Sequence, residues 1–187
     1  TNMVIIWNDW LKKMTDLINM KKKYTIGIIG LGYVGLPIAI EFGKKYVTYG
    51  YDINSERTKQ LKNGLDITNE NSSDYIKSSS NLIFSSQLES LNKCSIFIIT
   101  VPTPIDENNS PDLSILLKAT ESVGSILNKN SIVIFESTVY PGCTEEECVP
   151  VLEKISGLKY NEDFFCGYSP ERISPGDNQR TLTKIKK

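Results

Sequence analysis

Short apolar runs alternate along residues 24–187 with longer stretches in which apolar positions recur at helical spacing. Runs of this length, rich in Ile, Val and Phe, are typical of buried parallel strands. The predicted strands span residues 24–29, 46–51, 81–84, 95–101, 131–135 and 163–168. Strands that alternate with helices predict an α/β fold built on a parallel sheet.

The stretches between these strands predict the helices. One begins after Gly35 and ends near residues 43–45, and another covers residues 53–61. Further helices are predicted at residues 111–127 and 144–155, with a polar loop and a short helix at 66–80. With right-handed crossovers, this order predicts a Rossmann fold: a doubly wound parallel sheet in strand order 3-2-1-4-5-6 with helices on both faces.

Residues 1–19 precede the first predicted strand and form a candidate extension. Their apolar side chains fall at helical spacing and predict an amphipathic helix; they are Trp7, Trp10, Leu11, Met14, Leu17 and Ile18. Charged residues interrupt any signal-peptide core. Packing on the domain or on a partner subunit is favoured over a membrane-surface helix. The domain itself is expected to start at Met20 and to cover residues 20–187.

A glycine-rich turn joins the first predicted strand to the first helix. It is a G-x-G-x-x-G motif, made of Gly30, Leu31, Gly32, Tyr33, Val34 and Gly35. Gly30 allows the tight turn, Gly32 lets a pyrophosphate approach the backbone, and Gly35 lets the helix pack closely. The helix N-terminus would then bind the phosphates. The alternatives are a purely structural turn and an S-adenosylmethionine site.

Asp52 ends the second predicted strand, at the distance of about 20 residues expected for the acid of a dinucleotide site. Its carboxylate can accept hydrogen bonds from both hydroxyls of an adenosine ribose and would repel a 2′-phosphate, which favours NAD over NADP. Arg57 lies one turn into the next helix, where its guanidinium can reach the adenine or the ribose. A solvated surface arginine fits the spacing equally well.

Composition and charge narrow the function further. The 187 residues are 40% hydrophobic, which predicts one globular domain. The formal net charge of −1 gives no basic footprint for nucleic acid. No apolar run approaches the roughly 18 residues of a membrane span. The chain has no histidine, so proton transfer must use a carboxylate, lysine, hydroxyl or water.

The four cysteines are scattered and form no C-x-x-C pair. Reduced thiols in a cytoplasmic protein are favoured over disulfides or a zinc site. The run Glu145–Glu147 falls in the first turn of a predicted helix, where the helix dipole favours acids, so it is interpreted as structural.

Three further loops follow predicted strands, at the carboxyl ends where doubly wound sheets bind ligands. They are residues 101–105, 136–142 and 169–177. The first is a stiff Val-Pro-Thr-Pro-Ile segment whose prolines leave Thr103 free to contact a cofactor. All three are expected at the same edge of the sheet as the glycine motif.

Read together, four motifs resemble the UDP-glucose/GDP-mannose dehydrogenase family over residues 24–187. They are Gly-Leu-Gly-Tyr-Val-Gly-Leu-Pro, Val-Pro-Thr-Pro, Glu-Ser-Thr-Val-Tyr-Pro-Gly and Tyr-Ser-Pro-Glu-Arg-Ile-Ser-Pro-Gly-Asp. The last is similar to the version in the branch that acts on UDP-N-acetylhexosamines, which includes enzymes of Vi-polysaccharide synthesis. The resemblance implies oxidation of the C6 alcohol of a nucleotide sugar to a carboxylate with two NAD⁺, through a thiohemiacetal and a thioester on a cysteine, for bacterial capsule or O-antigen synthesis.

The resemblance also implies roles for single residues. The glycine motif would hold the pyrophosphate, Asp52 and Arg57 the adenosine, and Val101, Pro102, Thr103 and Ser137 would line the path to the nicotinamide. Thr138 matches a threonine that positions the catalytic water, and Glu171 a glutamate that works with this water as a base. Arg172 resembles a substrate-side residue, and a plain ion pair between Glu171 and Arg172 is the alternative.

Two departures from the family pattern bear on the substrate. Pro175 stands where the UDP-glucose branch has a second glutamate, which makes UDP-glucose less expected. Cys143 stands where the family usually has threonine, and no role follows for it.

The family's nucleophilic cysteine and catalytic lysine belong to a later substrate domain that this sequence lacks. None of its cysteines is therefore expected to be the nucleophile, and we expect an inactive NAD-binding part of a longer enzyme that binds its sugar mostly elsewhere and forms a homodimer or larger assembly. The rivals are a UDP-glucose or UDP-N-acetylmannosamine 6-dehydrogenase, a 6-phosphogluconate or 3-hydroxyacid type dehydrogenase, and a free-standing NAD-binding regulatory module.

Overall fold

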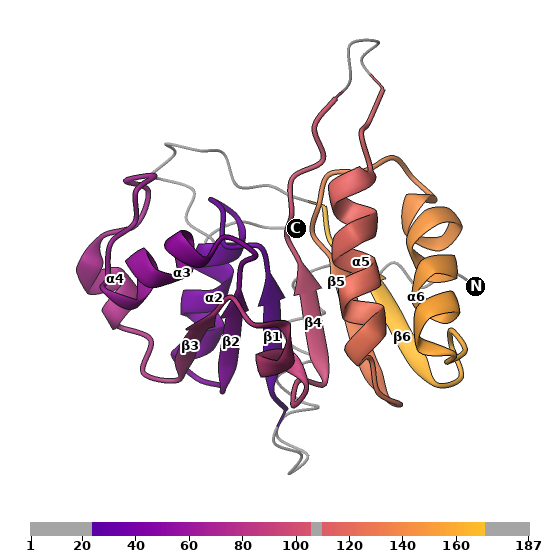
Figure 1. Cartoon of the computed structure of the whole chain (residues 1–187), viewed down its shortest axis with the longest axis horizontal. Coiled ribbons are helices and arrows are strands. Elements are labelled where there is room, and N and C mark those ends of the chain that lie inside the picture. The colour runs from indigo at the N-terminus through magenta and orange to yellow at the C-terminus, as the bar shows by residue number, and fades with distance from the viewer. Residues whose placement is uncertain (1–23, 106–109, 171–187) are drawn as a thin grey trace.

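The computed structural model describes residues 24–105 and 110–170, and these form a six-stranded parallel sheet in the order β3-β2-β1-β4-β5-β6 (Figure 1). The strands are β1 (Ile26–Ile29), β2 (Thr48–Tyr51), β3 (Leu82–Ser85), β4 (Ile96–Ile99), β5 (Ser131–Phe135) and β6 (Phe164–Tyr168). All neighbouring strands pair in parallel. The predicted Rossmann order is confirmed, and the strand order reverses between β1 and β4, where such sheets bind ligands.

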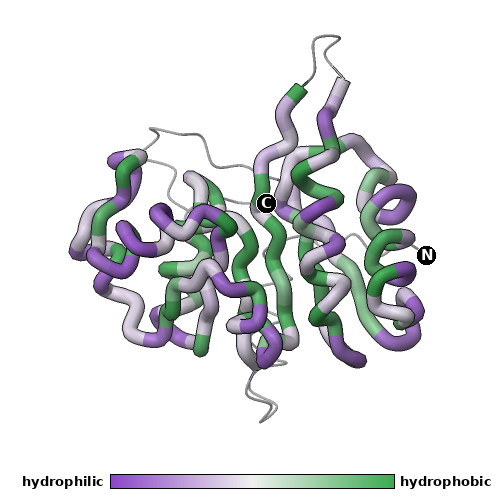
Figure 2. Tube along the Cα trace, in the orientation of Figure 1, coloured by the Kyte–Doolittle hydropathy of each residue, from purple (hydrophilic) through white to green (hydrophobic). Residues whose placement is uncertain are grey.

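The central strands β1 and β4 are buried along their whole length, and the chain trace is largely hydrophobic at the centre of the sheet (Figure 2). Along β4 the side chains alternate between two cores. Ile96 and Ile98 face one core and Phe97 and Ile99 face the other. A strand with apolar groups on both faces is stable only between two helical layers.

The helices supply these two layers (Figure 1). Helices α2 (Gly35–Gly43), α3 (Ser55–Lys62) and α4 (Ser73–Lys77) contribute to the first core. Helices α5 (Ser114–Ile126) and α6 (Val149–Ser156) cover the other face with the short 3₁₀ helix η1 (Leu88–Leu91). Asn54 and Ser55 are the two N-cap candidates that the sequence offers for α3. The structure selects Asn54, whose side chain accepts hydrogen bonds from the amides of Glu56 and Arg57.

Two helix boundaries differ from the sequence-based expectation. Helix α5 begins at Ser114, and not at Pro111, because Pro111 pairs with Ile105 in an antiparallel bridge and the Asp112 amide donates to the Pro104 carbonyl. The predicted helix at 144–155 opens with a π-helical turn, η2 (Thr144–Cys148), before α6. The 3₁₀ helix η1 was not predicted.

The predictions for residues 1–19, for a domain start at Met20 and for residues 171–187 lie outside the described residues. Within the described ranges, no helix combines the length and the apolar character needed to cross a membrane.

The glycine turn after β1 packs closely against the start of α2 and the end of β4. Gly30 has φ +94°, a left-handed conformation that favours glycine. Gly35, at the start of α2, has no room for a side chain, because a Cβ there would overlap the Gly30 carbonyl oxygen and the Thr100 hydroxyl. The predicted role of Gly35 in close packing is confirmed.

Substitution of Gly35 by Ala is expected to lower the free energy of unfolding by about 3 kcal/mol, because the clash is with backbone and the loop cannot yield locally. Gly157→Ala is the control: Gly157 has φ +69° but open space around it, so only backbone strain of about 1 kcal/mol is expected. Urea unfolding of both variants measures the difference. Equal losses would contradict the packing role.

Candidate functional site

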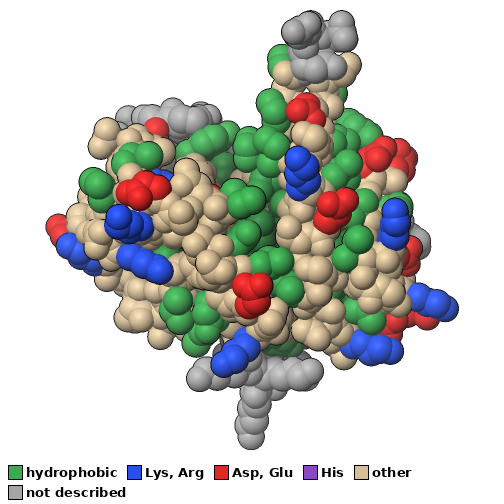
Figure 3. All heavy atoms as spheres, in the orientation of Figure 1, with side chains coloured by type: hydrophobic (Ala, Val, Ile, Leu, Met, Phe, Trp, Pro, Cys, Tyr) green, Lys and Arg blue, Asp and Glu red, His purple; other side chains and the backbone are tan. Residues whose placement is uncertain are grey.

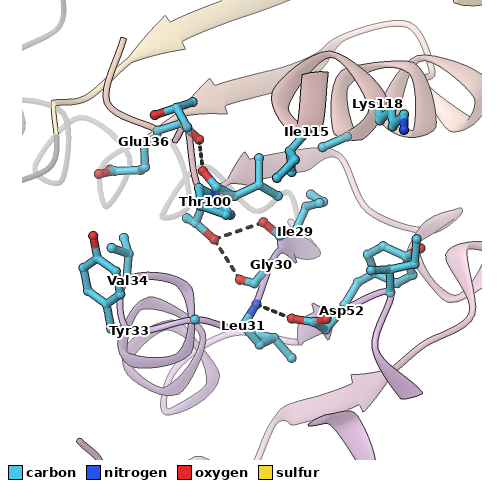
Figure 4. A pocket seen from close by; sticks show the side chains of 18 of the residues that line it. Ile29, Gly30, Leu31, Tyr33, Val34, Asp52, Thr100, Ile115, Lys118 and Glu136 are labelled. Carbon is cyan, nitrogen blue, oxygen red and sulfur yellow. Dashed lines mark hydrogen bonds between the residues drawn. The ribbon is translucent and has the colours of Figure 1, made fainter. Parts of the chain in front are cut away.

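A cleft of about 770 Å³ opens at the carboxyl ends of β1, β4 and β5. Its floor is the glycine turn, one side is the loop that follows β4, and helix α5 forms the facing wall (Figure 4). In the space-filling view, hydrophobic side chains gather in this region between α5 and the α3 half of the molecule (Figure 3). The site therefore lies where the reversal of strand order predicts it.

The hydroxyl of Thr100 holds the glycine turn against β4. Its Oγ1 lies 3.0 Å from the carbonyl oxygen of Ile29 and 2.8 Å from that of Gly30, and its one proton is shared between these two acceptors (Figure 4). Thr100 is buried, so these bonds are shielded from water. The position of the turn is thus set by a strand that is distant in sequence.

The Asp52 carboxylate lies at the end of β2 and borders the cleft. Its Oδ2 accepts from the Leu31 amide at 2.9 Å and its Oδ1 from the Asn54 amide at 2.9 Å. An ionised carboxylate has about four acceptor positions. Each oxygen therefore keeps acceptor capacity for a ribose hydroxyl after these backbone bonds are made.

Hydrogen bonds also tie the loops after β4 and β5 together. The Thr103 hydroxyl donates to the Thr138 carbonyl at 2.6 Å, and the Ser137 hydroxyl donates to the Val101 carbonyl at 2.6 Å. Ser137 is buried, whereas the Thr138 side chain is exposed at the cleft. The two loops therefore form one continuous wall.

The surroundings of Arg57 rule out one of the two interpretations that the sequence left open. It is only 7% exposed, so the solvated surface arginine is contradicted. Its Nε and Nη2 donate to the Leu31 carbonyl at 3.0 and 2.9 Å, and its Nη1 pairs with Asp66 Oδ1 at 2.7 Å. It lines a second hollow of about 290 Å³, which shares Leu31, Gly32 and Asp52 with the main cleft. A contact with the adenosine stays a prediction.

The structure brings most of the predicted site residues together at the cleft. Those that line it are Gly30, Leu31, Gly32, Tyr33, Val34, Asp52, Val101, Pro102, Thr103, Ser137 and Thr138. Gly35 packs behind the turn and Arg57 lines the second hollow. Glu171 and Arg172 lie outside the described residues.

Helix α5 contributes a wall that the sequence interpretation missed. Ile115, Lys118, Ala119 and Ser122 line the cleft. They recur at i, i+3, i+4 and i+7, which is one face of a helix. Because this face mixes polar and apolar residues, the sequence does not distinguish it from an ordinary solvent-exposed face. Its position directly after a loop at a strand end is the signal that could have found it. Thr100 and Glu136, each directly after a buried strand, were missed for similar reasons.

None of the four thiols lines the cleft. Cys94, Cys143 and Cys148 are buried, all four are free, and burial raises the pKa of each thiol. A thiol with a raised pKa is a poor nucleophile at neutral pH. In the described ranges no cluster of metal-ligating side chains occurs, so the run Glu145–Glu147 does not form one either.

The residues present fit a dinucleotide. A Cβ built on Gly32 would meet nothing within 4 Å, so the backbone there is open to a ligand. The N-terminus of α2 faces the same turn and favours negative charge. The apolar Ile115 and the acceptor Asp52 border one cleft, as a base and its ribose require.

Comparisons with known proteins agree with this geometry. The family model described as "UDP-glucose/GDP-mannose dehydrogenase family, NAD binding domain" matches residues 24–187. A UDP-N-acetyl-D-glucosamine 6-dehydrogenase of Pseudomonas aeruginosa is 57% identical over 166 residues, which is 89% of this chain and 39% of that protein. Protein CapL of Staphylococcus aureus is 56% identical over 162 residues, 87% of this chain and 38% of that protein.

Solved structures give the same picture. The UDP-D-ManNAc dehydrogenase of Pyrococcus horikoshii superposes with a TM-score of 0.77 at 37% sequence identity, over 81% of this chain and 37% of that one. The chain thus spans about two fifths of the length of the relatives it matches.

Replacement of Gly32 by Ala is expected to change the free energy of unfolding by less than about 0.5 kcal/mol, because the added methyl group meets no atom. The same methyl group would stand where a pyrophosphate approaches the turn, so dinucleotide affinity should fall by at least about tenfold. Calorimetric titration and urea unfolding check the two halves. An unchanged affinity would contradict the placement of the phosphates at this turn.

Proposed function

The chain belongs to the UDP-glucose/GDP-mannose dehydrogenase family, and we propose that it is the NAD-binding domain of an enzyme that oxidises the C6 alcohol of a UDP-N-acetylhexosamine to a uronate. The observation that carries the cofactor half is the Asp52 carboxylate, which accepts a hydrogen bond from the Leu31 amide and borders the cleft beside the glycine turn. The identity of 57% to a UDP-N-acetyl-D-glucosamine 6-dehydrogenase supports the substrate half.

NAD⁺ supplies a hydride acceptor when it is bound. The chain's own residues bind and orient it: the open backbone of the glycine turn and the N-terminus of α2 take the pyrophosphate, and Asp52 takes the ribose hydroxyls. Val101, Pro102, Thr103 and Ser137 lead along the cleft toward the nicotinamide end. Because the wall they form is cross-linked by hydrogen bonds, it orients the cofactor without having to rearrange.

Thr138 and Glu171 are proposed to act in hydrolysis of the thioester that the family's chemistry implies. The Thr138 backbone is held by the Thr103 hydroxyl, which fixes the position from which its own hydroxyl would bind a water. Ser169, which follows β6, is held at the end of β5 because its amide donates to the Phe135 carbonyl at 2.9 Å. The role of Glu171 is proposed from its match to the family motif. Arg172 is proposed as a substrate contact.

Two NAD⁺ per sugar, a homodimeric or larger assembly of the longer enzyme, and a role in capsule or O-antigen synthesis in the bacterial cytoplasm are part of the proposal. They rest on the likeness of the four motifs to the UDP-N-acetylhexosamine branch of the family. The identity to UDP-N-acetylmannosamine dehydrogenases is lower, at 38% for the example from Pyrococcus horikoshii, which favours the glucosamine side of that branch.

Calorimetric titration of the 187-residue chain tests the cofactor half. We expect NAD⁺ to bind to the wild type and Asp52→Ala to lower its affinity by about tenfold or more. The wild type should bind NADP⁺ no more tightly than the Asp52→Ala variant binds NAD⁺, because the carboxylate repels a 2′-phosphate. Asp74→Ala is the control, since Asp74 is an exposed acid in the first turn of α4, away from both hollows. Equal affinities of the wild type for NAD⁺ and NADP⁺ would contradict the role of Asp52.

The chain alone is expected to produce no steady-state oxidation of UDP-N-acetylglucosamine. The reason is that its thiols are buried or shielded, with raised pKa values, and none lines the cleft. Absorbance of NADH at saturating NAD⁺ measures this, with the full-length relative from Pseudomonas aeruginosa as the positive control. NADH formation by the chain would contradict the prediction. If that activity also survived Cys→Ser substitution at all four positions, the reaction would not need a cysteine nucleophile.

A further inference from the structure

We propose that Asp66, acting through Arg57, fixes the orientation of the Leu31–Gly32 peptide and thereby sets the affinity of the glycine turn for a pyrophosphate. In this proposal Asp66 and Arg57 are positioning residues that need not touch the cofactor. For Arg57 this is an alternative to the adenosine contact that the family resemblance implies, and the test below separates the two. The inference rests on the proposed binding of NAD at this turn.

The Leu31 residue is held from both of its polar backbone groups. Its amide donates to Asp52 Oδ2 at 2.9 Å. Its carbonyl accepts from Arg57 Nε at 3.0 Å and from Arg57 Nη2 at 2.9 Å. The side chain of Leu31 is buried as well, with no exposed surface. Rotation of this residue would therefore break every one of these contacts.

The next amide is fixed as a consequence. In a planar trans peptide the carbonyl of one residue and the amide of the next point in opposite directions. Since Arg57 holds the Leu31 carbonyl, the Gly32 amide must point away from Arg57. Gly32 has no side chain to hold its own conformation, and its surroundings are open. The orientation of this amide, which is one of the donors that a phosphate would meet, thus depends on Arg57.

Arg57 in turn depends on Asp66. Both groups of the ion pair are buried, with side-chain exposures of 8% for Arg57 and 0% for Asp66, at a distance of 2.7 Å. A buried guanidinium without its partner would carry a large desolvation cost and would turn toward solvent. The planar guanidinium can bridge Asp66 and the Leu31 carbonyl at the same time because its donors form a rigid fork.

Asp66 is itself anchored by the loop that follows α3. Besides Arg57, its carboxylate accepts from the amide and hydroxyl of Thr68 and from the amide and side chain of Asn71. Burial raises the pKa of this carboxyl, and the hydrogen bonds from Asn71, Arg57 and Thr68 outweigh burial and leave it below its ordinary value. The group is therefore an anion throughout the neutral range, as the ion pair requires.

The test compares two ligands that carry a pyrophosphate, NAD⁺ and ADP, with one that does not, adenosine. ADP carries adenosine and a pyrophosphate, whereas adenosine carries no phosphate. The 187-residue chain is titrated with NAD⁺, ADP and adenosine, using calorimetry for the first two and protein NMR shifts for the weak third. The variants are Asp66→Asn and Arg57→Lys, which replaces the fork by a point charge. Tyr75→Phe is the control, because it removes a partly buried hydrogen bond to Glu41 in the same half of the domain.

The expected result is a loss of about tenfold in affinity for NAD⁺ and ADP in both variants, and a change of less than about twofold for adenosine. A merely structural role would lower all three affinities together or none of them, and Tyr75→Phe tests for such a general effect of lost stability. Circular dichroism checks that each variant is folded. If Asp66→Asn does not fold, Arg57→Lys alone decides.

Equal losses for ADP and adenosine would overturn the inference, because Arg57 would then act on the adenosine. Unchanged affinities in folded variants would overturn it as well. A folded wild-type chain that binds neither NAD⁺ nor ADP would refute the proposed function, and with it this inference. Normal wild-type binding together with unaffected variants would refute the inference alone.

Discussion

The close approach of helix α2 to the end of strand β1 determines where the rest of the site lies. The Thr100 hydroxyl reaches the carbonyls of Ile29 and Gly30, and the absent side chain of Gly35 lets the helix start against them. A side chain at this point would push the helix away from the sheet. The amides of the turn would then move with it, so the proposed phosphate-binding geometry and the core packing depend on one contact.

Two aspartates on the same side of the domain have different roles because their surroundings differ. Asp52 is partly exposed and keeps acceptor capacity beyond its two backbone bonds. Asp66 is almost completely buried, and its acceptors are taken by Arg57, Thr68 and Asn71. The first is therefore suited to a ligand, and the second to holding the backbone that receives it.

The sequence predicted the strand order and the glycine turn because these depend on local chemistry. A G-x-G-x-x-G motif between a strand and a helix, with an acid at the next strand end, leaves few alternatives. The contact of Arg57 with Leu31 was not predictable in this way, since it joins residues 26 positions apart through a side chain that could equally have faced solvent. The start of α5 was misplaced for a related reason: Pro111 suits a first helical turn, but a bridge to Ile105 takes it out of the helix.

The face of α5 that lines the cleft is a second feature that the sequence alone could not predict. Ile115 and Lys118 lie on one helical face, and only the fold reveals that this face borders the cleft. Core positions such as Leu116 and Val123 could be recognised, because burial of an apolar stripe is required of any helix that covers a sheet. Function-bearing faces carry no such requirement, and their composition is correspondingly less informative.

The strand order also places the proposed chemistry in sequence along one edge of the sheet. Strands β2, β1, β4 and β5 are consecutive neighbours, so their carboxyl ends present Asp52, the glycine turn, Val101 and Thr138 in that spatial order. With about 4.8 Å between neighbouring strands, three steps span roughly 14 Å. An extended ligand lying across these ends would meet the ribose acceptor first, then the phosphate-binding amides, and finally the proposed water-binding threonine. The order of components in the site is therefore a consequence of the reversal between β1 and β4, and it does not require any loop to carry a group across the cleft.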